Sequence, residues 1–197
     1  MDIQSAISQV SSGKNLTKDD MSEIILEILE GKVTDAQIGA FLIALSMKGE
    51  TVDEVIGAVS VMRDLSTKVE INAPNLIDTC GTGGTGIGIF NVSTTSAFIA
   101  SSCGAKIAKH GNRSATRKSG SADLLEQAGV SLSLTPKQVA SCIEEVGLGF
   151  MFAQTHHSAM RHVVGPRKEI GQKSIFNVLG PLTNPASAKR QVLGVYD

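Results

Sequence analysis

Apolar residues in the first third of the chain recur at the spacing of an amphipathic helix. Within residues 24–29 they fall three and four positions apart, on one face of a helical turn. Three stretches begin with a threonine that can accept a hydrogen bond from a first-turn amide: residues 17–31, 34–49 and 51–65. Gln37 and Glu54 lie three residues after their threonines and complete capping boxes. The pattern predicts a small N-terminal α-helical domain, residues 1–70.

From residue 71 onward, short apolar runs alternate with helical stretches. The runs typical of buried strands are 76–80, 105–109, 148–153 and 190–197. The helical stretches are 94–102, 121–129 and 135–147, the last with Thr135 as its cap and Pro136 as its first residue. This alternation predicts an α/β fold with a mainly parallel sheet flanked by helices, whose binding sites lie beyond the carboxyl ends of the strands.

We expect residues 71–197 to form a partial α/β domain that is incomplete at its C-terminus. The reason is that the last apolar run, 190–197, has no helix after it. Part of the segment 155–185 is expected to pack back on the helical domain. Residues 177–185, which contain two prolines, are expected to form a rigid loop.

The chain as a whole is almost neutral. The 197 residues are 42% hydrophobic and carry a formal net charge of −1, so any anion site must come from a local arrangement. Three cysteines, Cys80, Cys103 and Cys142, lie far apart without metal-ligand spacing, which favours a reducing cytoplasm. No apolar run approaches the roughly 20 residues needed to span a bilayer, and the N-terminus lacks the pattern of a secretion signal. We therefore expect a cytoplasmic protein with no membrane partner.

The chemistry begins at the glycine-rich stretch "GTGGTG", residues 81–86. It formally matches the dinucleotide motif G-x-G-x-x-G, which needs an acidic residue about 20 positions later. There is no Asp or Glu between Thr79 and Ala122. The same span carries the basic residues Lys106, Lys109, Arg113, Arg117 and Lys118. Local positive charge beside the glycines favours a phosphate or diphosphate over a dinucleotide.

A helix expected to start near Asn91 strengthens the phosphate interpretation. Its first amides would point at an anion, and Asn91, Ser93 and Thr94 would add side-chain partners, with the Ser93 hydroxyl as a possible magnesium ligand. The stretch lacks the G-K-[ST] ending of nucleotide-triphosphate loops. A structural turn that merely requires glycine is the alternative.

Two further clusters follow. Residues 109–123, "KHGNRSATRKSGSAD", combine basic and hydroxyl side chains before another helix start. This combination indicates a second anion cradle, and so a ligand with two phosphate groups. A solvated basic loop is the alternative.

Residues 152–185 hold three histidines, His156, His157 and His162, without a recognised metal-binding spacing. In the same segment, Arg167 offers a guanidinium fork that can bind a carboxylate.

These three clusters, in this order and spacing, resemble the anthranilate phosphoribosyltransferases of tryptophan biosynthesis. The resemblance covers nearly the whole chain. It implies a homodimer formed through the helical domain and transfer of the phosphoribosyl group of phosphoribosyl diphosphate (PRPP) to the amine of anthranilate, with Mg2+ and release of diphosphate. The reaction needs no protein nucleophile, because the amine attacks the anomeric carbon as diphosphate leaves. Lys109 would act electrostatically on the departing diphosphate.

The resemblance also implies the site residues. Those for PRPP are Gly81, Gly84, Thr85, Ile89, Asn91, Val92, Ser93, Thr94, Lys109, Asn112, Arg117 and Ser121. Those for anthranilate are Gly81, His110, Asn112, Arg167 and Gly180. Ser93 would be a magnesium ligand and Arg167 would address the anthranilate carboxylate.

Two departures from the family pattern bear on activity. Thr85 stands where the family usually has aspartate after the glycines. The adjacent Asp-Glu pair that anchors magnesium in the family is expected beyond Asp197, so we expect weak or absent turnover from this chain although the full-length protein is an enzyme.

Two other functions compete with the transferase. A pyrimidine nucleoside phosphorylase shares the architecture and a similar glycine loop but binds inorganic phosphate and a nucleoside; "NVLGPLTNP" together with "KHGNRS" favours the transferase. A non-catalytic relative that binds nucleic acid would need phosphate contacts and bases to stack on. The net charge of −1, one tyrosine and no tryptophan argue against it. The expected partners are therefore PRPP and anthranilate, and no nucleic acid.

Overall fold

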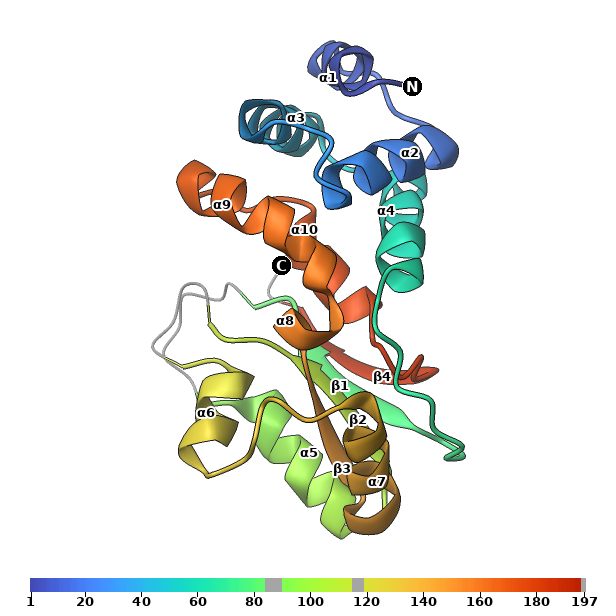
Figure 1. Cartoon of the computed structure of the whole chain (residues 1–197), viewed down its shortest axis with the longest axis vertical. Helices are drawn as coiled ribbons and strands as arrows, with labels where there is room; N and C mark the ends of the chain where they lie inside the picture. Colours follow the sequence, from blue (N-terminus) through green and yellow to red (C-terminus); the bar gives the residue numbers. More distant parts are fainter. Residues whose placement is uncertain (84–89, 115–118, 196–197) are drawn as a thin grey trace. The chain divides into compact units, whose positions relative to one another are not determined.

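The computed structural model describes residues 1–83, 90–114 and 119–195, which form two compact units (Figure 1). The first unit comprises Met1–Leu65 and His157–Leu182 and is helical. The second comprises Ser66–His156 and Thr183–Asp197 and holds the sheet. Within the described ranges, no helix combines the length and apolarity needed to cross a bilayer.

The helices of the first unit begin where the sequence places their caps. They are α1 (Ile3–Ser11), α2 (Lys18–Leu29), α3 (Asp35–Lys48), α4 (Val52–Asp64), η1 (Ser158–Met160), α9 (Arg161–Ile170), α10 (Phe176–Leu179) and η2 (Gly180–Leu182). Thr17, Thr34 and Thr51 each accept a hydrogen bond from the amide three residues later. The capping boxes of α3 and α4 are confirmed, with Gln37 and Glu54 each accepting a hydrogen bond from the cap amide. Helix α1 was not singled out from the sequence.

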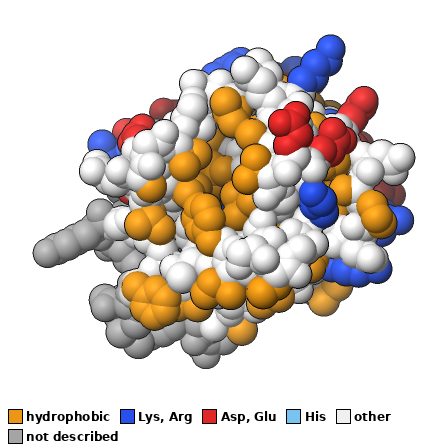
Figure 2. Space-filling view, turned by 90° about the horizontal axis from the view of Figure 1, so that it is seen from below, with side chains coloured by type: hydrophobic (Ala, Val, Ile, Leu, Met, Phe, Trp, Pro, Cys, Tyr) orange, Lys and Arg blue, Asp and Glu red, His pale blue; other side chains and the backbone are white. Residues whose placement is uncertain are grey.

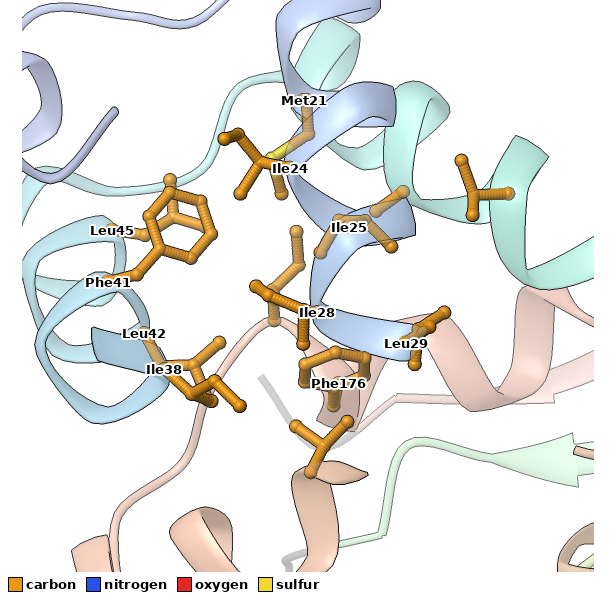
Figure 3. Close-up of a cluster of buried hydrophobic side chains, with 14 of the residues drawn as sticks. Met21, Ile24, Ile25, Ile28, Leu29, Ile38, Phe41, Leu42, Leu45 and Phe176 are labelled. Carbon is orange, nitrogen blue, oxygen red and sulfur yellow. The ribbon is translucent and has the colours of Figure 1, made fainter. Parts of the chain in front are cut away.

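The core of the first unit takes side chains from α1 to α4, α9 and α10, and Figure 3 shows the part to which α2 and α3 contribute most. The labelled side chains in Figure 3 are all buried: Met21, Ile24, Ile25, Ile28, Leu29, Ile38, Phe41, Leu42, Leu45 and Phe176. Phe176 belongs to the later segment of the unit and packs among the aliphatic side chains of the early helices. Burying a side chain of this size stabilises the fold by about 1.5 to 3 kcal/mol, so the two segments are held together by apolar packing.

The second unit contains a parallel sheet, as the alternating pattern predicted. Its strands are β1 (Ile77–Gly81), β2 (Ile107–Gly111), β3 (Leu148–Phe152) and β4 (Arg190–Gly194), in the order β3-β2-β1-β4. Its helices are α5 (Val92–Ser102), α6 (Ser121–Gln127), α7 (Pro136–Val146) and α8 (Ala153–His156). The register pairs Gly81 with Gly194 and Gly111 with Phe152, so all four strands end level at one edge of the sheet.

A space-filling view shows that apolar side chains also reach the surface (Figure 2). The exposed ones in the second unit include Val92, Phe98 and Ile99 of α5, at 46%, 48% and 61% exposure. Single exposed apolar residues are common on folded proteins, so they do not by themselves mark a site.

One expectation about the later segment was wrong. Residues 177–182 are not a rigid loop, because they form most of α10 and the 3-10 turn η2. Phe176 and Leu179 lie three positions apart and are both buried, at 5% and 0% exposure. Their burial on one face favours helical turns, and Pro181 is compatible with the 3-10 turn.

Candidate functional site

The end of β1 explains the first glycines of the glycine-rich stretch. A Cβ placed on Gly81 would lie 3.1 Å from the carbonyl oxygen of Gly194, and the amide of Thr82 donates to that same oxygen at 3.0 Å. Gly83 has a φ of +69°, in the left-handed region, with open space around it. Glycine is thus favoured at Gly81 by close approach of β4 and at Gly83 by backbone conformation. Gly84, Thr85 and Ile89 lie outside the described residues.

Helix α5 begins at Val92 with Asn91 as its N-cap, as the sequence predicted. The Asn91 side chain does not cap the helix and instead donates from Nδ2 to Ser119 Oγ at 3.4 Å. Ser93 is half-buried and Thr94 is buried in the first turn. The Val92 amide donates to the Phe90 carbonyl at 2.8 Å, whereas the Asn91 side chain caps none of the first amides. An uncapped helix N-terminus carries partial positive charge and attracts anions.

Lys109 joins the strand ends to this helix through Thr79. The lysine is 3% exposed, and its Nζ donates to the Thr79 carbonyl oxygen. Thr79 Oγ1 in turn donates to the carbonyl oxygen of Ser93 at 3.0 Å. Burial lowers the pKa of Lys109, while the negative charge of Asp78 raises it. The arrangement brings Gly81, Ser93 and Lys109 to one part of the second unit.

Sequence reasoning missed Asp78, a fully buried carboxylate in β1. It accepts hydrogen bonds from the His110 amide at 3.1 Å and from Gln191 Nε2 at 3.2 Å. Burial raises the pKa of the nearby Cys80 to about 12, with the Asp78 charge adding to the effect. The signal in the sequence was an acid inside a buried strand, where a charge is costly unless it is hydrogen-bonded or paired.

The basic side chains of residues 109–123 are not all available to bind an anion. Arg113 forms ion pairs with Asp123 at 2.9 Å and Glu126 at 2.7 Å. At the start of α6, the Gly120 amide donates to Asp123 at 2.7 Å and the Ala122 amide donates to the Asn112 carbonyl at 3.3 Å. The helix start that was expected to form a second anion cradle therefore already uses these two amides internally.

The PRPP residues in this cluster are only partly described. Ser121 Oγ donates to the Asn112 carbonyl oxygen at 3.2 Å, so the two residues are brought together. Asn112 is exposed. Arg117 lies outside the described residues.

The residues expected to bind anthranilate belong to different units. His110, buried, and Asn112 are in the second unit, whereas Arg167 and Gly180 are in the first. Arg167 lies over the ring of Phe176, 5.5 Å from its centroid, and burial lowers the pKa of its guanidinium. Among the described residues, no carboxylate forms an ion pair with Arg167. Unlike Arg113, it therefore has a cationic fork without an internal acid.

The described residues do not form an acidic magnesium site. No three His, Cys, Asp or Glu side chains among them are grouped so as to hold a metal ion. Ser93 would contribute a single hydroxyl, whereas Mg2+ is usually held by one or two carboxylates together with substrate phosphates. Two of the histidines have packing roles instead: His156 Nδ1 hydrogen-bonds to the Thr67 carbonyl, and the His162 ring packs against Gly31.

Two family models match the chain. The model described as "Glycosyl transferase family, helical bundle domain" matches residues 4–66, and "Glycosyl transferase family, a/b domain" matches residues 73–197. The anthranilate phosphoribosyltransferases of Ectopseudomonas mendocina (strain ymp) and Thioalkalivibrio sulfidiphilus (strain HL-EbGR7) are 57% and 58% identical to it over 196 residues. These alignments cover 100% of this chain but 56% and 58% of the relatives, so the chain spans little more than half their length.

Solved structures of anthranilate phosphoribosyltransferases have the same fold as this chain. Anthranilate phosphoribosyltransferase from Thermus thermophilus superposes with a TM-score of 0.92 at 42% identity, over 98% of this chain and 58% of that one. The Saccharomyces cerevisiae enzyme in complex with PRPP and Mg superposes with a TM-score of 0.91 at 30% identity, over 99% and 58%. These similarities confirm the resemblance carried by the three sequence clusters, and they lend no support to the phosphorylase or nucleic-acid-binding alternatives.

Proposed function

We propose a phosphoribosyl transfer function for this chain, which belongs to the glycosyl transferase family built from a helical bundle domain and an α/β domain. The reaction is transfer of the phosphoribosyl group of PRPP to the amine of anthranilate, which gives N-(5-phosphoribosyl)anthranilate and diphosphate. Relatives that are 57% and 58% identical carry the name of this activity. The chain spans about 56% to 58% of their length, so we propose this activity for the whole protein and the PRPP cradle as the contribution of this chain.

One observation carries the proposal most directly. Thr79 links a buried cation to an uncapped helix N-terminus, since its carbonyl accepts from Lys109 and its hydroxyl donates to Ser93 at 3.0 Å. Amides without a capping side chain and a desolvated ammonium group are both suited to a diphosphate. Gly81, which the backbone of β4 approaches closely, lies at the same strand ends. We propose that the PRPP residues named from the resemblance line this cradle.

The chemistry follows from charge and position. The anthranilate nitrogen forms a bond to the anomeric carbon, the bond from that carbon to the diphosphate oxygen breaks with its electron pair going to the oxygen, and the surplus proton passes from the nitrogen to water. Negative charge grows on the leaving diphosphate, where Lys109 and the α5 amides stabilise it. Arg167, which has no acidic partner within the described residues, would orient the substrate carboxylate.

Mg2+ is proposed as the cofactor because a yeast relative was crystallised with PRPP and Mg. On this chain, Ser93 is the proposed magnesium ligand, and the substrate phosphates would supply the remaining contacts.

A homodimer formed through the helical domain and a cytoplasmic location are further proposals. The homodimer rests on the resemblance to the family, and the free cysteines Cys80, Cys103 and Cys142 support the cytoplasmic location.

Anthranilate binding by the PRPP-loaded chain tests the acceptor assignment. We expect anthranilate, followed by its fluorescence, to bind in the presence of PRPP and Mg2+, and Arg167→Ala to weaken that binding by about tenfold or more, as for loss of a charged hydrogen bond. Arg161→Ala, at an exposed arginine of the same helix α9, serves as the matched control. Equal anthranilate affinity of the two variants would overturn the assignment of Arg167. Binding of thymidine with inorganic phosphate, in place of PRPP with anthranilate, would overturn the proposed function.

A further inference from the structure

Asp78 ties together the three strands that meet at the cradle. It is 0% exposed and lies in β1, three residues before Gly81. Its Oδ1 accepts a hydrogen bond from the His110 amide of β2 at 3.1 Å, and its Oδ2 accepts one from Gln191 Nε2 of β4 at 3.2 Å. One carboxylate therefore bridges the strands on both sides of β1.

Lys109, next to His110 in β2, is a buried side chain that bonds to Thr79, the residue after Asp78, and forms no direct ion pair with this carboxylate. Its Nζ donates to the Thr79 carbonyl, which is a neutral acceptor. Burial lowers the pKa of Lys109, and the charge of Asp78 opposes that effect. Cys80 is the other titratable group that acts on Lys109, and burial raises its pKa to about 12, so it remains a neutral thiol at physiological pH. Of the groups identified around Lys109, Asp78 is the one that supplies a compensating negative charge.

We propose that Asp78 is a positioning residue, which holds Lys109 as a cation and fixes the strand ends that present it to the diphosphate. The inference rests on the proposed function, because it gives Lys109 the role of contacting the diphosphate. It adds a residue that touches no substrate and acts through its neighbour. A carboxylate at this position reconciles a buried lysine with the need for a positive charge there.

Substitution by asparagine separates the charge of Asp78 from its shape. Asp78→Asn keeps an acceptor for the His110 amide and removes the negative charge. The variant should therefore fold, but Lys109 should lose its proton at a lower pH than in the natural chain. Loss of a charged hydrogen bond weakens binding by about tenfold or more, so the effect on diphosphate affinity should appear on the alkaline side.

The first experiment is calorimetric titration of the whole chain with inorganic diphosphate from about pH 6 to about pH 10. We expect Asp78→Asn to bind like the natural chain at the acidic end and to lose affinity at a lower pH than the natural chain does, with a difference of up to about tenfold in the pH range between the two titrations. Glu145→Gln, at an exposed carboxylate of α7, should leave the profile unchanged. If the natural chain binds diphosphate and Asp78→Asn has the same pH profile, the inference is overturned and the proposed function stands. If the folded natural chain does not bind diphosphate, both are overturned.

A second measurement needs no ligand. The 13Cε resonance of Lys109, identified by its disappearance in Lys109→Met, reports the protonation of Nζ directly. We expect its titration to move to lower pH in Asp78→Asn and to stay in place in Glu145→Gln. An unmoved titration in Asp78→Asn would overturn the inference, because a purely structural carboxylate would leave the charge of Lys109 unchanged.

Discussion

Glu54 is predicted to be the most sensitive polar residue of the helical unit. Its carboxylate is 0% exposed and accepts hydrogen bonds from the amide of Leu16 at 2.9 Å, the amide of Thr51 at 2.7 Å and Nζ of Lys48 at 2.9 Å. The Lys48 side chain is only 4% exposed. A single side chain thus joins the loop before α2, the start of α4 and the end of α3.

The loss of stability on removing the Glu54 carboxylate can be estimated from the partners that it leaves unpaired. Glu54→Ala leaves two backbone amides without acceptors, at about 1 to 3 kcal/mol for each that stays buried, and leaves Lys48 without its counter-charge. Breaking a buried ion pair from one side typically costs about 3 to 5 kcal/mol. Lys48 keeps Asn15 Oδ1 at 3.0 Å and the Gly49 carbonyl at 2.7 Å, so we expect the lower end, about 3 kcal/mol. That is a large share of the roughly 5 to 15 kcal/mol of a whole domain.

The assay is urea unfolding followed by far-UV circular dichroism, together with hydrogen exchange at the Leu16 amide. Glu30→Gln is the matched control, because Glu30 pairs with Lys32 on the surface, where an ion pair contributes about 0 to 1 kcal/mol. Glu54→Ala should lower the free energy of unfolding by about 3 kcal/mol and speed exchange at Leu16. A loss no larger than that of Glu30→Gln would show that the buried Glu54 carboxylate does not stabilise the helical unit.

Acid gives an independent check on the same residue. Burial alone would raise the pKa of Glu54, but hydrogen bonds from Thr51, Leu16 and Lys48 outweigh it and hold the pKa below its usual value. The stabilisation is therefore present above the unfolded pKa of about 4.3 and is lost as pH falls through the lower native pKa. Glu54→Gln should remove this part of the acid dependence, and an unchanged acid profile would contradict it.

Two shorter predictions concern glycine and cysteine positions. Gly31→Ala should cost about 2 to 3 kcal/mol, because φ is +76° and a Cβ would lie 2.6 Å from the His162 ring; Gly13→Ala, with a φ of +77° and open space, should cost only about 1 kcal/mol in the same urea assay. With a thiol-reactive disulfide reagent at about pH 8, the exposed Cys103 should react at once, and Cys80, whose pKa burial raises to about 12, should react only on unfolding. Reaction of Cys80 in the folded chain would contradict its burial.

Local signals in the sequence predicted local structure well. The Thr34 and Thr51 caps, with Gln37 and Glu54 three residues on, were predictable because every partner lies within one helical turn. The bond from Leu16 to Glu54 spans 38 residues and has no signature in the sequence. The parallel sheet followed from the alternation of apolar runs and helical stretches, whereas the strand order follows from packing between distant segments.

In the candidate site too, the local features were predictable from the sequence and the contacts between distant segments were not. The α5 start was predictable from the polar residues that begin at Asn91, but the burial of Lys109 and its bond to Thr79 depend on the packed sheet. Composition also overstated the free positive charge, because Arg113 pairs with acids of α6. Asp78 was missed because its partners come from strands that follow it by many residues.

Calorimetric titration of the chain with PRPP, for the natural sequence and for Lys109→Met, decides whether the strand ends bind the diphosphate. We expect saturable binding by the natural chain and at least about tenfold weaker binding by the variant, because the diphosphate loses its buried cation. Equal binding by the two, or no binding by the folded natural chain, would contradict the claim that the ends of β1 and β2 and the start of α5 form a PRPP cradle.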